Sequence, residues 1–119
     1  MPAGRYNFTI EQGADFSRVL TWTDSSGGAV DLTGFQAHMK IKVANASPAI
    51  VSLTITPTVN GDVLMLGGSS GTITITITHV TTAALDFREA RYDLELESPA
   101  GIVTRLVEGI VSFTAEVTV

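Results

Sequence analysis

The amino-acid sequence predicts an all-β protein, an antiparallel β-sandwich of about eight or nine short strands with one short helical turn. Residues Phe35–Val43 alternate between apolar and polar without a break, as in a strand with one buried face. Residues Thr72–Thr78 repeat threonine and isoleucine, two β-branched types that favour strands. Clusters of glycine, asparagine, aspartate, serine and proline separate such segments, and no long segment has a helical period. We expect residues 1–119 to form a single domain.

The first two strands are expected at Tyr6–Glu11 and Phe16–Thr23, with Gln12–Asp15 as the break between them. Trp22 is expected in the core, because a tryptophan at a strand centre buries a large area. Arg18 interrupts the apolar parity of the second strand, so we expect it near a strand end or at a β-bulge.

Turn residues punctuate the central part of the chain. Gly34 is expected to take a positive φ in the turn before the first alternating segment. Pro57 limits pairing after the strand Ile50–Ile55, which indicates a sheet edge or a strand end. Asn60-Gly61 predicts a two-residue hairpin turn leading into Asp62–Leu66, since both turn residues tolerate positive φ.

Residues His79–Leu85 lose the period of two and are expected to form the helical turn, with Thr78 in the capping position. Three more strands are expected at Tyr92–Glu97, Ile102–Val107 and Val111–Val119. Glu108-Gly109 between the last two is a bulge or kink rather than a break. A parallel sheet is not expected, because no crossover helices are available. If the threonine–isoleucine strand or the last strand is an edge, its open N–H and C=O groups would invite a partner strand.

The composition excludes several classes of function. The chain has no cysteine, so disulfides, thiol catalysis and cysteine-based metal sites are absent. The net charge of −5 disfavours binding to nucleic acid, and Lys40 and Lys42 are the only close lysine pair. No apolar run reaches the ~18 residues that span a membrane, and no signal peptide is recognisable at the N-terminus. We therefore expect synthesis in a cytoplasm and no membrane partner.

Three carboxylates, Asp93, Glu95 and Glu97, share one face of a predicted strand. Side chains two apart on a strand are separated by ~6.6 Å, which is near the carboxylate spacing of inverting glycosidases, and hard cations such as Ca²⁺ also bind carboxylate rows. A solvated acidic face is the simpler interpretation. If this strand lies beside Phe35–Val43, the three acids would pair with Lys40 and Lys42 across the strands and set their register. These five residues are the candidate interaction site.

The remaining candidates for chemistry do not form a site. His38 and His79 lie far apart in the sequence, which is more typical of surface residues than of a metal centre. The Gly67–Gly71 loop runs into a strand rather than a helix, so it lacks the helix N-terminus of phosphate-binding loops. No spacing indicates a catalytic triad, although triads are spatial. The sequence predicts no catalytic, cofactor-binding or metal-binding residue.

Short motifs follow one another in a distinctive order along the chain. They are Phe8–Phe16, Leu20–Asp24, Val30–Gly34, Thr81–Leu85, Tyr92–Leu96, Arg105–Gly109 and Val117-Thr118. In this layout the sequence resembles the Ig-like β-sandwich proteins in the tails and baseplates of tailed bacteriophages. It is similar to the long-tail-fibre β-sandwich type and to the amino-terminal domain of baseplate upper proteins. The resemblance implies a virion component of the tail region that links tail, neck or baseplate proteins and fibres, and it implies no catalytic residues.

The expected function is therefore structural and non-enzymatic, with protein–protein contacts to other virion proteins and several copies in a symmetric assembly. The alternative is a carbohydrate-binding module that recognises host-surface glycans. Such modules expose aromatic side chains that stack on sugars, whereas Tyr6, Phe8, Phe35, Tyr92 and Phe113 all fall on faces predicted to be buried. A hydrolase is the third possibility, and no motif supports it.

Overall fold

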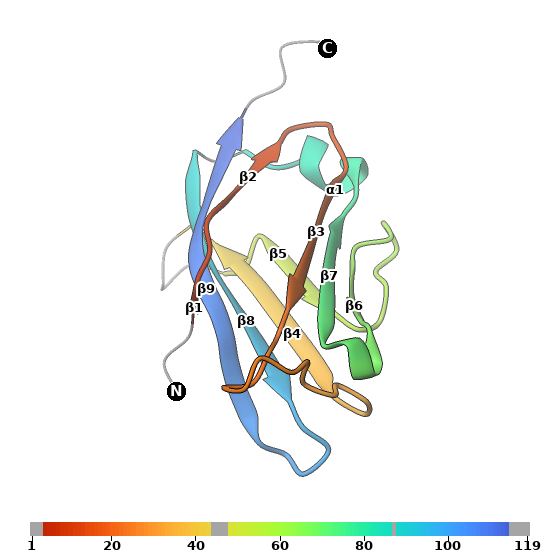
Figure 1. The fold of residues 1–119 in the computed structure, drawn as a ribbon. Coiled ribbons are helices and arrows are strands. Elements are labelled where there is room, and N and C mark those ends of the chain that lie inside the picture. The colour runs from red at the N-terminus through yellow and green to blue at the C-terminus, as the bar shows by residue number, and fades with distance from the viewer. Residues whose placement is uncertain (1–3, 44–47, 87, 115–119) are drawn as a thin grey trace.

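Two β-sheets face each other in the structure, a computed structural model that describes residues 4–43, 48–86 and 88–114 (Figure 1). The large sheet contains β1 (Gly4–Arg5), β2 (Phe8–Glu11), β9 (Val103–Thr114), β8 (Glu89–Glu97), β4 (Gln36–Lys42) and β5 (Val51–Thr54). The small sheet contains β3 (Phe16–Thr21), β7 (Thr72–Ile77) and β6 (Val63–Leu66). The helical segments are a 3₁₀ turn, η1 (Gly68–Ser70), and α1 (His79–Ala83). The predicted β-sandwich and its strand number are confirmed. Nowhere in the described ranges is a helix long and apolar enough to cross a membrane.

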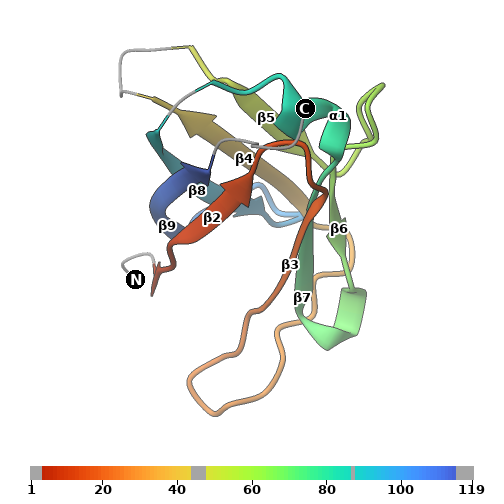
Figure 2. The same cartoon turned by 90° about the horizontal axis from the view of Figure 1, so that it is seen from above.

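The core lies between the sheets and follows the predicted alternation. Seen from above, β9, β8 and β4 form one layer, and β3, β7 and β6 form the other (Figure 2). The inward side chains of the regular strands are almost fully buried. They include Ala37, Met39 and Ile41 on β4, Ile73, Ile75 and Ile77 on β7, and Tyr92, Leu94 and Leu96 on β8. Because each strand places its polar residues on the opposite side, the outer face of the large sheet is left for charged side chains.

The N-terminal strands depart from the antiparallel expectation. β1 and β2 pair with β9 in parallel, with Phe8 opposite Val111 and Glu11 opposite Thr114. The whole remaining domain connects these strands, so a parallel pair forms here without a crossover helix. The N-terminal strands thus lie beside β9, the C-terminal strand of the chain, and the sheet of β3, β7 and β6 faces them. This arrangement is an immunoglobulin-like β-sandwich.

Arg18 lies in the middle of β3, so both predicted positions for it are wrong. β3 pairs with β7 in unbroken register, and β3 is an edge strand of the small sheet. The Arg18 guanidinium lies 4.9 Å from the centre of the Phe16 ring and donates a hydrogen bond from Nε to the Tyr6 hydroxyl (3.2 Å). An edge has no neighbouring strand on one side, and therefore an inward charged residue there still reaches solvent.

Neither β7, the threonine–isoleucine strand, nor β9, the last strand, is an open edge. β7 lies between β3 and β6, and β9 lies between β8 and the N-terminal strands. β5 is the last strand of the large sheet and ends at Thr54, which agrees with the edge or strand end expected from Pro57.

The Asn60-Gly61 hairpin prediction is wrong. β5 and β6 belong to different sheets, and the turn between them is closed by a backbone hydrogen bond from Thr58 N–H to the Asp62 carbonyl (3.0 Å). Gly61 has a φ of 90°, but no non-glycine residue in the described ranges has a positive φ. A two-residue hairpin turn of type I′ needs positive φ at both central residues, so this turn is of another type. Gly34 does have the predicted positive φ, at 81°.

The helical turn forms as predicted, but its cap differs. Thr78 makes no side-chain capping bond and donates its hydroxyl to the Asn60 carbonyl (2.8 Å). Carboxylates from distant turns accept the free N–H groups instead: Asp62 bonds Thr78 N–H (2.7 Å) and Asp15 bonds His79 N–H (2.6 Å). The helix start is therefore fixed by tertiary contacts that a local pattern does not contain.

The last two predicted strands form the single strand β9, so Glu108-Gly109 is not a break. The register shifts opposite Leu94 and Glu95, which pair with Val107 and Arg105, and this leaves Leu106 as the extra residue. The end of the predicted last strand, residues 115–119, lies outside the described residues. Trp22 follows β3 rather than occupying its centre, and it is half-buried against the core.

A candidate interaction surface on the large sheet

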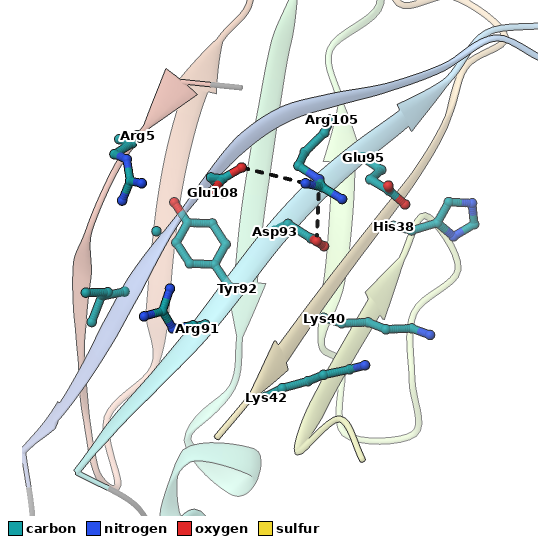
Figure 3. Close-up of a pocket in the computed structure, with 12 residues that line it drawn as sticks. Arg5, His38, Lys40, Lys42, Arg91, Tyr92, Asp93, Glu95, Arg105 and Glu108 are labelled. Atoms are coloured by element: carbon teal, nitrogen blue, oxygen red, sulfur yellow. Dashed lines mark ion pairs between the residues drawn. The ribbon is translucent and has the colours of Figure 1, made fainter. Parts of the chain in front are cut away.

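The outer face of the large sheet gathers charged side chains from four strands around a hollow of about 570 Å³ (Figure 3). We call this surface the charged face. Its members are Arg5 on β1, His38, Lys40 and Lys42 on β4, Arg91, Asp93 and Glu95 on β8, and Arg105 and Glu108 on β9. On β4 and β8 these residues occupy alternate positions, and the residues between them point into the core. The fold therefore converts four separate sequence patterns into one surface.

The charged face is basic, although the chain is acidic. It holds five of the seven lysine and arginine residues of the chain and three of its twelve carboxylates. With histidine neutral, the charged face carries a charge of +2 and the rest of the chain carries −7, which together give the net charge of −5. A separation of charge on this scale produces a surface potential that steers and orients charged partners.

The predicted neighbourhood of the lysines and acids is confirmed. β4 pairs with β8, and Lys40 lies directly opposite Asp93. The predicted cross-strand ion pairs do not form, because neither Lys40 nor Lys42 takes part in an ion pair among the described residues. Lys42 lies opposite Arg91 rather than an acid, and Glu97 lies opposite Gln36, outside the hollow. That the five predicted residues take part in assembly stays a prediction.

The ion pairs on the charged face run through Arg105. Its Nε lies 3.7 Å from the Asp93 carboxylate and its Nη1 lies 3.8 Å from that of Glu108. Arg105 lies opposite Glu95 in the register, but its side chain reaches Asp93, two residues away along β8. The side chains of Arg105 and Asp93 are 54% and 42% exposed, and exposed pairs of this kind stabilise a fold by less than about 1 kcal/mol. These charges therefore contribute little to folding stability and remain available to a partner.

Sequence reasoning missed Arg5, Arg91, Arg105 and Glu108. Arg91 could have been found, because it lies two residues before Asp93 and so shares its face. Arg105 and Glu108 could not, because they are three apart and only the extra residue in β9 places both on the outer face. Arg5 arrives through the parallel pairing of the first and last strands.

The described residues contain no group of three or more histidine, aspartate or glutamate side chains that could hold a metal ion. His38 lies on the charged face, whereas His79 begins α1 and contacts Asp15 through Nδ1 at 2.8 Å. The hydrogen bonds from His79 hold the pKa of the Asp15 carboxyl below its usual value. Asp15 and His79 thus tie the turn between β2 and β3 to α1.

No protein-family model matches this sequence, and no curated protein matches it. Among solved structures, one described as "Structure-based site-directed photo-crosslinking analyses of multimeric cell-adhesive interactions of VGSC beta subunits" is similar in fold. It is 11% identical to this chain, with 96% of this chain and 93% of that chain covered and a TM-score of 0.49. This likeness concerns the course of the backbone alone.

Proposed function

We propose that this chain is a structural, non-enzymatic protein of the tail region of a tailed bacteriophage, and that it joins neighbouring virion proteins through the charged face. The observation that carries the contact role is the collection of five of the seven basic residues on one sheet face of an acidic chain. The virion role is supported by the resemblance of the sequence motifs to Ig-like tail and baseplate proteins.

The arrangement of the charges favours a protein partner. Carboxylates of Asp93, Glu95 and Glu108 are interspersed among the cations, so a uniform polyanion such as nucleic acid would meet like charges at each of them. A folded protein surface carries both signs and can match such a mosaic.

The carbohydrate-binding alternative gains no support from the described aromatic residues. Phe8, Phe16 and Tyr92 are buried, and Tyr6, Trp22, Phe35 and Phe113 are half-buried against the core. A sugar-stacking platform needs an aromatic ring with one open face.

Immunogold electron microscopy on phage particles from the source lysate, with antibody raised against this chain, tests the proposal. Gold at the neck, tail or baseplate supports a virion role and locates it. Intact, accessible particles without gold, together with free protein in the lysate, would contradict it, and a glycan array would then be the next experiment.

A second experiment tests the contact itself. Phage that produce the chain with Lys42→Glu and Arg91→Glu should incorporate less of it than wild type, because both side chains are on the charged face. The control is Ala29→Glu with Ala100→Glu, which adds the same two glutamates at exposed loop residues that do not line the hollow. Equal loss in both variants would contradict a role for the charged face.

A further inference from the structure

One corner of the charged face carries positive charge without a paired acid. We call Lys40, Lys42 and Arg91 the basic corner. None of the ion pairs formed among the described residues involves any of the three. Lys42 and Arg91 lie directly opposite each other on β4 and β8, a like-charge arrangement that is unfavourable in an isolated sheet. Glu89, two residues before Arg91 on the same exposed face, makes no ion pair with it.

Opposite charge gathers at the end of the domain that holds α1. We call the exposed residues Glu11, Asp15 and Asp86 the acidic end. Several hydrogen bonds hold their segments together: among them, the Gln12 side chain donates to the Leu85 carbonyl (3.3 Å), and Gly13 N–H donates to the Thr82 hydroxyl (3.1 Å).

The acidic end is separate from the basic corner on the same molecule. Arg91 on β8 pairs with Ile110 of β9, and Glu11 on β2 pairs with Thr114 of β9. The two β9 partners are four residues apart, which is ~13 Å along the strand, and β8 and β2 lie on opposite sides of β9. Among the described residues, Arg88 lies two residues after Asp86, and His79 contacts Asp15 through Nδ1 at 2.8 Å. Three carboxylates against these two side chains leave the acidic end with a net negative charge. The two patches therefore cannot neutralise each other within one copy.

We propose that the basic corner docks the acidic end of a second copy of this chain. The two patches are different surfaces, so the contact is heterologous: each copy uses its corner for one neighbour and its end for the next. Such a contact continues into a ring if the rotation between copies closes, and into a filament if it does not. This inference rests on the proposed use of the charged face as an interface, but not on the place of the chain in a virion.

Sedimentation velocity on the purified full chain tests the proposal, over a series of protein concentrations in ~20 mM and ~500 mM NaCl, where the Debye length is about 20 Å and about 4 Å. We expect concentration-dependent oligomers at low salt that dissociate at high salt. A monomer at every concentration in low salt would overturn the proposal, and it would leave a virion role found by immunogold intact.

Charge-reversal variants identify the surfaces. The corner variant is Lys42→Glu with Arg91→Glu, and the end variant is Glu11→Lys with Asp86→Lys. Each should lower the association constant about tenfold or more, since it turns attractive pairs into repulsive ones worth about 1.4 kcal/mol in total. A mixture of the two variants should assemble again, because the reversed corner of one fits the reversed end of the other.

The control for added negative charge is again Ala29→Glu with Ala100→Glu, which should associate as wild type does. Circular dichroism of each variant establishes that it is folded. Association that persists in the corner and end variants, or a mixture that stays monomeric, would overturn the proposal.

Discussion

Tyr92 fastens the N-terminal segment to the large sheet, and replacing it with phenylalanine tests how strongly that contact stabilises the fold. The ring of Tyr92 is buried against Phe8, with ring centres 4.7 Å apart. Its hydroxyl donates a hydrogen bond to the Tyr6 carbonyl, which lies between β1 and β2. Tyr92→Phe keeps the ring and removes this bond.

The expected loss follows from what remains behind. A typical internal hydrogen bond contributes about 0.5–1.5 kcal/mol, and an acceptor left without a partner away from water costs about 1–3 kcal/mol. We expect Tyr92→Phe to lower the free energy of unfolding by about 1.5 kcal/mol. For 119 residues at about 2.1 cal/mol/K each, the unfolding entropy is about 0.25 kcal/mol/K, so the Tm should fall by about 6 °C.

Urea unfolding followed by the fluorescence of Trp22, the one tryptophan of the chain, measures this loss. The matched control is Tyr6→Phe, which also removes one hydroxyl, but from an exposed bond with Arg18. It should cost less than about 0.5 kcal/mol. The reasoning is refuted if Tyr92→Phe costs no more than Tyr6→Phe.

The same hydroxyl gives a pH signature. Burial raises the pKa of Tyr92 above its usual value near 10, so the folded state keeps a proton that the unfolded state loses. The resulting stability is fully present below about pH 10 and is lost as the pH rises toward the folded pKa. In Tyr6→Phe protein, Tyr92 is the only tyrosine, and its absorbance change on ionisation should coincide with alkaline unfolding. Ionisation near pH 10 in the folded protein would contradict this.

Three further substitutions test the close approach of two backbone segments, the start of α1 and the protection of an edge strand. Gly109→Ala would place a Cβ 2.3 Å from the Tyr6 carbonyl, so it should cost about 2 kcal/mol in urea unfolding, and a neutral result would contradict the close approach. Asp62→Ala removes the buried acceptor of Thr78 N–H at the start of α1, and a loss of about 3 kcal/mol is expected in the same assay; below about 1 kcal/mol the capping role fails. Arg18→Ala removes the inward charge of edge strand β3, so light scattering should show faster aggregation than wild type, and an unchanged rate would refute an edge-protecting role.

The strands that could be predicted from the sequence are those whose central inward side chains are almost fully buried. Phe35–Val43, Thr72–Thr78 and Tyr92–Glu97 alternate with a period of two, and a slip of one residue would expose the whole apolar set. Each forms a strand in the structure, and the ends of that strand lie within three residues of the predicted bounds. The pattern does not contain strand direction, so it could not indicate that the first strands run parallel to β9.

The candidate site was predictable to the same degree. That Lys40 and Asp93 share one outer face was predictable on the condition that their strands are neighbours, because both lie on polar faces of well-defined strands. Arg105 was not, since one extra residue in β9 changes which side chains point outward. The acids that fix the start of α1 come from turns far away in the sequence, and local pattern holds no information on such contacts.

The edges of the sheets support contact through side chains rather than through added strands. β5 and β6 have four residues each, and the N-terminal edge is divided into β1 and β2, so neither sheet offers a long row of free backbone groups there. The longest edge strand, β3, has an inward arginine, and the Arg18 Nη1 already donates to the Ser17 carbonyl at 3.1 Å. Short or charged edges oppose strand addition. The charged face and the acidic end carry no such obstacle, and we therefore expect partners to bind to these side chains and not to add a strand to either sheet.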